Sequence, residues 1–158
     1  MLPPLPSAPG RRTALRAAVG LAAAIAVAAP AVALAGTSFI APTPSGHVSV
    51  VLSRDGRQVT QSYIGYTQKC SDGSAYTDWD SFRAIPVSGS GAFRAGYDTG
   101  LVTQTDGAAT DYVGSISGRV NKRATQVTGT AHFAFAVRKP DGTMITCDTG
   151  VITFRARD

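Results

Sequence analysis

The sequence contains no glutamate, only two histidines (His47 and His132) and only two cysteines (Cys70 and Cys147). Hydrolysis by two carboxylates would therefore have to use aspartate alone. Neither histidine lies within a ligand spacing of a cysteine, as a zinc site would require, and no Gly-x-Ser-x-Gly turn occurs. These gaps predict no catalytic residues, no metal ligands and no cofactor.

Long segments free of glycine and proline are also missing. After residue 35 the longest such segment is the twelve residues 74–85, which excludes long helices. The runs between these breakers are rich in Val, Ile, Thr, Tyr and Phe, which suit a pleated, half-buried surface. The sequence predicts an all-β, antiparallel fold.

A strong excess of one charge is absent after residue 35. Of the fifteen Lys and Arg residues, Arg11, Arg12 and Arg16 precede this point, which leaves twelve against ten Asp. A charge of about +2 does not make the dense basic face that nucleic acid requires. We therefore expect no nucleic-acid partner.

The first 35 residues have the pattern of a cleaved signal peptide. Arg11, Arg12 and Arg16 precede an uncharged apolar run, and Ala33-Leu34-Ala35 fits the rule of small residues before a cleavage site. The paired arginines leave the general secretory and twin-arginine routes both open. We predict a secreted, extracellular protein with a flexible spacer at 36–46, one domain at 47–158 and no membrane association after cleavage.

Alternating side chains predict the two longest strands. In 126–137, Val127, Gly129, Ala131, Phe133, Phe135 and Val137 share one face, and 110–120 has the same pattern. Asp-Gly pairs at 55, 72, 106 and 141 separate further runs as turns. About eight short strands predict a two-sheet β-sandwich, jelly-roll-like, with an open β-barrel as the alternative.

Cys70 and Cys147 are predicted to form a disulfide, because the chain carries an export signal and two cysteines only. Cys147 begins a run, Cys-Asp-Thr-Gly-Val-Ile-Thr-Phe, that is interpreted as the last strand. The bridge would then join the end of an early strand to the start of the last one.

The segment 71–80 collects acids, hydroxyl groups, a tyrosine and the only tryptophan. Tyr76 and Trp79 offer flat faces to a sugar ring, while Asp78 and Asp80 accept hydrogen bonds from its hydroxyl groups. Two other interpretations stay open. Asp72, Ser74, Asp78 and Asp80 could bind Ca²⁺, or Trp79 could pack in the core beside Cys70 while the acids cap turns.

The sequence favours a non-enzymatic extracellular module with a binding or structural role, in contact with carbohydrate or a cell-surface component. The alternative is a small secreted hydrolase assembled from residues distant in sequence, such as His132 with an aspartate. Periodicity cannot detect such an assembly, and His132 has no nucleophile beside it in the sequence.

Overall fold

The computed structural model describes residues 36–44 and 46–158, so the predicted signal peptide lies outside the described residues. Strands make up 68% of the described residues, which form no helix, and this confirms the all-β, antiparallel prediction. This part of the chain forms ten strands, not about eight: β1 (Ser38–Thr43), β2 (Gly46–Leu52), β3 (Gln58–Cys70), β4 (Ala75–Pro86), β5 (Ala92–Asp98), β6 (Val102–Thr103), β7 (Ala109–Val120), β8 (Gln126–Arg138), β9 (Met144–Asp148) and β10 (Ile152–Arg157).

The strands form one sheet that closes into a barrel, and the predicted two-sheet sandwich is not confirmed. Six antiparallel strands close the ring in the order β10-β1-β2-β3-β9-β8, because β8 also pairs with β10. The alternative, a barrel, is supported, although this one is closed and not open. Four outer strands extend it: β4 pairs with β3, β7 with β8, and β5 and β6 with β7.

Closure depends on a break in the segment predicted as one last strand. Gly150 adopts a φ of 62°, a left-handed conformation that glycine tolerates best. The chain therefore turns between β9 and β10, and both strands pair with the same edge of β8. Residues 134–138 pair with β9 and residues 126–131 with β10. Strand β10 can then also pair with β1.

The predicted disulfide is confirmed and lies where β3 meets β9. These two strands share only two residue pairs, Lys69 with Asp148 and Cys70 with Cys147. The two cysteines are directly opposite each other and are bonded across 77 residues of chain. The disulfide thus reinforces a short strand pairing. Among neighbouring strands of the barrel, only β1 and β10 share fewer residue pairs.

Two segments predicted as irregular are strands. Residues 38–43 of the predicted flexible spacer form β1, whose Phe39 and Ala41 are buried. The residues from Asp72 to Asp80, interpreted as a loop, largely form the first half of β4, where pairs with β3 run from Ala75 onward. Alternation was hidden here because charged and aromatic side chains, not aliphatic ones, occupy the inner face.

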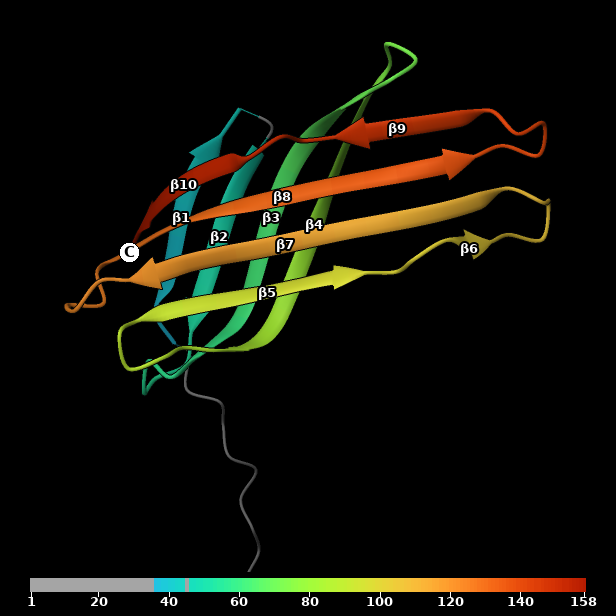
Figure 1. Cartoon of the computed structure of the whole chain (residues 1–158). Coiled ribbons are helices and arrows are strands. Elements are labelled where there is room, and N and C mark those ends of the chain that lie inside the picture. The colour runs from blue at the N-terminus through green and yellow to red at the C-terminus, as the bar shows by residue number, and fades with distance from the viewer. Residues whose placement is uncertain (1–35, 45) are drawn as a thin grey trace, which may run out of the picture. The chain divides into compact units, whose positions relative to one another are not determined.

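The core fills the space between two crossing groups of strands. Figure 1 shows β1 to β4 running across the direction of β5, β7 and β8. Ala84 has a positive φ of 56° and is skipped in the otherwise regular pairing of β3 with β4, and Phe82 and Ile85 on either side of it are both buried. The buried cluster includes side chains from the barrel and the outer strands: Phe39, Val48, Val50, Leu52, Val59, Ile64, Phe82, Ile85, Phe93, Ile116, Val127, Phe133 and Phe154.

Candidate ligand-binding cavity

At one end of this interlayer space the aliphatic core gives way to a cavity of about 480 Å³. That volume is typical of small-molecule sites, which occupy about 300–1,000 Å³. We call it the tyrosine–aspartate cavity. Strands β3, β4, β5, β7 and β8 contribute its lining: Tyr66, Gln68, Tyr76, Asp78, Trp79, Asp80, Tyr97, Tyr112, Val113, Phe133, Ala134 and Phe135.

Strand pairing brings the acidic residues to the inner face of β4. Asp78 lies opposite Tyr66 and Tyr76 lies opposite Gln68. Directly paired residues in an antiparallel sheet project to the same side. Because Tyr66 and Gln68 are buried at 7% and 2% exposure, Asp78 and Asp80 also point between the layers. The predicted cluster of Tyr76, Asp78 and Asp80 therefore faces a cavity.

Tyr97 bridges the two layers. Its hydroxyl group on β5 donates a hydrogen bond to Oδ2 of Asp80 on β4. Its ring lies over Gly114 of β7, where a Cβ atom would come within 2.5 Å of the ring. Burial, followed by the contact with Asp80, raises the pKa of Tyr97 well above its usual value of 10.0. Tyr97 is therefore a neutral hydrogen-bond donor that holds Asp80 in place.

Gln68 is the cavity residue with an unmet hydrogen bond. Its side chain is 2% exposed, and its Oε1 atom has no hydrogen-bond partner among the described residues. A buried polar atom without a partner costs about 1–3 kcal/mol. Such an atom beside a cavity is an acceptor available to a ligand that carries a donor.

Aromatic rings form the floor and the mouth of the cavity. Tyr66 stacks on Phe133 with ring centroids 4.4 Å apart, and burial raises its pKa well above 10.0. At the mouth, Tyr76 and Tyr112 contact Phe135 from two sides. These two tyrosines are about half exposed, so ring faces and hydroxyl groups are accessible to a bound molecule.

Trp79 is at the rim and does not belong to the core. It is 55% exposed, and its ring stacks on Tyr63 at 5.2 Å, which in turn stacks on His47. This row lies on the outer face of β2, β3 and β4, because Trp79 alternates along its strand with the inward-facing Asp78 and Asp80. The interpretation in which Trp79 packs in the core beside Cys70 is therefore wrong. The backbone amide of Trp79 donates a hydrogen bond to Oδ1 of Asp78, with a distance of 2.8 Å.

Sequence reasoning missed the residues that the fold adds from elsewhere in the chain. Tyr66 and Gln68 belong to β3, Tyr97 to β5 and Tyr112 to β7. One signal was available: Ile64, Tyr66 and Gln68 alternate along one strand, and a buried glutamine in that pattern indicates a polar site. The pairing of β3 with β4 is needed to connect that signal to Asp78.

His132 and Asp148 converge on a different surface, the outer face of β8. Nε2 of His132 is 3.1 Å from both carboxylate oxygens of Asp148. Burial opposes ionisation of Asp148, but the amide of Gly150 and the His132 ring together lower its pKa below 3.8. Ser115 lies opposite His132 on β7. No hydrogen bond joins Ser115 to His132 among the described residues.

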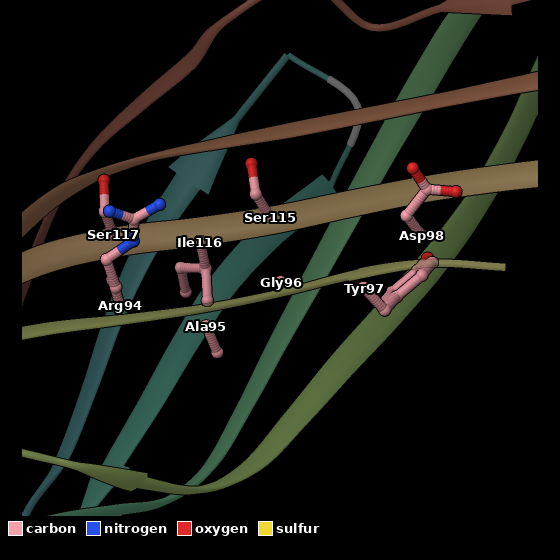
Figure 2. Close-up of a pocket in the computed structure, with 8 residues that line it drawn as sticks. All are labelled: Arg94, Ala95, Gly96, Tyr97, Asp98, Ser115, Ile116 and Ser117. Atoms are coloured by element: carbon pink, nitrogen blue, oxygen red, sulfur yellow. The ribbon is translucent and has the colours of Figure 1, made fainter. Parts of the chain in front are cut away.

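Ser115 also lines a shallow hollow of about 590 Å³ along β5 and β7. Figure 2 shows Arg94, Ser115 and Ser117 on one side of these strands, with Ala95 and Ile116 on the other. The hollow is more open to solvent than the tyrosine–aspartate cavity. Of the tyrosines of the tyrosine–aspartate cavity it includes only Tyr97, and it does not include Gln68.

Within residues 36–44 and 46–158, no group of three or more His, Cys or Asp side chains is arranged to hold a metal ion. The same residues contain no helix with the length and apolar character of a membrane crossing. Asp72 accepts hydrogen bonds from Ser74 in the β3–β4 turn.

Comparison with models of protein families, with curated proteins and with solved structures found no match to this chain.

Proposed function

We propose that the protein is a secreted, non-enzymatic binding module and that the tyrosine–aspartate cavity takes a sugar ring from a carbohydrate or a cell-surface glycan. The observation that carries the proposal is the buried, unpartnered Oε1 of Gln68 at a cavity lined by tyrosines and aspartates. Sugars present apolar ring faces and hydroxyl donors together. The cavity offers aromatic faces and oxygen acceptors in the same arrangement.

The depth of the cavity favours one ring or chain end over an extended surface. Tyr66 and Phe133 form its floor, while Tyr76 and Tyr112 stand at the mouth. A ring held between the tyrosines would place hydroxyl groups toward Asp78 and Gln68. Each sugar hydroxyl can donate to one of these oxygens.

Export is proposed on the sequence pattern of residues 1–35 together with the disulfide. A bond between Cys70 and Cys147 persists in an oxidising compartment, such as the outside of the cell. N-terminal sequencing of protein from the culture medium should find a start at or near Gly36. Retention of Arg11 and Arg12 would contradict this.

A glycan array with two tyrosine variants tests the binding proposal. Tyr76→Ala removes a half-exposed ring from the cavity mouth and should abolish binding without unfolding the protein. Tyr63→Ala is the matched control, because Tyr63 lies on the opposite face of the neighbouring strand, stacked on Trp79. Equal binding by both variants, or no binding by the wild type, would contradict the proposal.

A second candidate function is hydrolysis at Ser115, His132 and Asp148, favoured by the 3.1 Å contact between His132 and Asp148. Here Asp148 would orient the imidazole, and His132 would accept the proton of Ser115. A fluorophosphonate probe separates the two functions. Labelling of the wild type but not of Ser115→Ala would support hydrolysis, and absence of labelling would leave binding as the function.

A further inference from the structure

We infer that the sugar bound in the tyrosine–aspartate cavity carries a free, cationic amine. This inference rests on the proposed function and names the chemical class of its ligand. It comes from the charge, the hydrogen-bond acceptors and the aromatic faces that converge at one end of the interlayer space.

The first step concerns charge. Asp78 and Asp80 both line the cavity, and none of the described lining residues is lysine or arginine. The only acid–base contact of the described residues within salt-bridge distance is His132 with Asp148, on the outer face of β8. Two carboxylates in a partly desolvated cavity therefore face no protein cation, and a cationic ligand would neutralise them.

The second step concerns which carboxylate is available. Asp80 is already engaged on both oxygens, by the Ser81 amide and by the Tyr97 hydroxyl group. Among the described residues only the Trp79 amide donates to Asp78, and it reaches Oδ1 alone. Oδ2 of Asp78 is therefore the carboxylate oxygen best placed to accept a hydrogen bond from a ligand.

The third step concerns Gln68, which is independent of the acidic cluster. Its unpartnered Oε1 is buried, and Gln68 lines the cavity at the position of β3 that pairs with Tyr76. An ammonium group has three donors and no acceptor. It can therefore donate to both the amide oxygen of Gln68 and the carboxylate of Asp78. A neutral acetamido group has a single N–H donor and cannot donate to both.

The fourth step concerns the rings. Tyr66, Tyr76, Tyr97 and Tyr112 line the same cavity. The faces of aromatic rings attract cations within about 6 Å of the ring centre. Burial keeps Tyr66 and Tyr97 protonated, so neither adds a negative charge and both present neutral ring faces to an ammonium group.

Isothermal titration with glucosamine, N-acetylglucosamine, glucose and tetramethylammonium tests the inference on the full exported protein. Glucosamine should bind at least about tenfold more tightly than the two neutral sugars, because hydrogen bonds from a charged donor to a carboxylate are stronger than those between neutral groups. Asp78→Asn should remove that preference. Asp158→Asn, which removes an exposed carboxylate outside the cavity, should retain it.

The outcomes separate the inference from the proposed function. Equal binding of all three sugars, with no effect of Asp78→Asn, overturns the cationic preference and leaves the sugar-binding proposal standing. Binding of tetramethylammonium without any sugar overturns the sugar proposal and with it this inference. A preference for glucosamine that Asp78→Asn abolishes supports both.

Discussion

The two ends of the interlayer face differ sharply in chemistry although the same strands build them. Toward one end β3 presents Val59 and Ile64, both 0% exposed, and toward the other it presents Tyr66 and Gln68. Strand β4 changes in the same direction, from Ile85 and Phe82 to Asp80 and Asp78. One end is a packed core, and the other is a cavity with an unmet hydrogen bond.

This difference separates the positions whose residues stabilise the fold from the positions whose residues do not. Aliphatic side chains at the cavity end would continue the core and remove the cost of burying Gln68 Oε1. Tyrosines and aspartates occupy these positions instead. Local departures from good packing and complete hydrogen bonding are expected at functional sites.

The largest expected effect is at the core end. Phe39→Ala should lower the free energy of unfolding by about 3–5 kcal/mol, because removing this fully buried ring leaves a cavity between the strands. Tyr112→Ala, at the mouth of the cavity and 46% exposed, should cost far less. Urea unfolding of both variants measures the contrast. Equal losses would contradict the division into a core end and a cavity end.

The next effect concerns the disulfide between β3 and β9, beside the cavity. Removing the bond between Cys70 and Cys147 should lower the free energy of unfolding by about 2–4 kcal/mol, with roughly 4.5 as the upper figure for so long a loop. Because Cys147 lies opposite Phe135, hydrogen exchange should accelerate around the cavity before it does around Val50 and Val127. Uniform acceleration across both ends would contradict this order.

A smaller effect is expected where Tyr97 crosses between the layers. Gly114→Ala would place a methyl group within 2.5 Å of the Tyr97 ring, and overpacking of this kind costs about 1–3 kcal/mol. Displacement of Tyr97 also removes its contact with Asp80, so ligand affinity should fall as well. Gly89→Ala is the control, because a Cβ atom there meets nothing within 4 Å. Similar melting temperatures for the two variants would show that the ring is not held by Gly114.

The smallest effect is a dependence on alkaline pH that belongs to the cavity end. The pKa values of Tyr66 and Tyr97 are higher in the folded chain than in the unfolded one. Their contribution to the free energy of unfolding is therefore complete below about pH 10. It is lost as the pH rises through the pKa values of the two tyrosines in the folded chain. Tyr97→Phe should reduce the fall in stability above pH 10. An unchanged fall in this variant would contradict the assignment of Tyr97.

Much of the framework is predictable from the sequence, because alternation and turn residues are local signals. The inward faces of β7 and β8 carry Ile116, Val120, Val127 and Phe133 as predicted, and the disulfide follows from cysteine number. Closure of the ring is not predictable in this way. It depends on the turn at Gly150 and on β10 pairing with both β1 and β8, which are long-range choices.

The site divides in the same manner. Tyr76, Asp78 and Asp80 are close in the sequence, so their clustering is visible before folding. The other walls come from β3, β5, β7 and β8, and nothing in the local pattern connects Tyr97 with Asp80, 17 residues earlier. The orientation of Trp79 depends on the side of β4 that meets the core, which only strand pairing determines.

The most direct test of the contrast between the two ends is the free energy of unfolding of Gln68→Met without ligand. Methionine has a similar length and no polar amide to bury, so the variant removes the unpartnered Oε1 atom. We predict that the variant is more stable than the wild type by about 1–3 kcal/mol. A variant less stable than the wild type would show that Gln68 serves packing or folding, and would contradict its assignment to a ligand site.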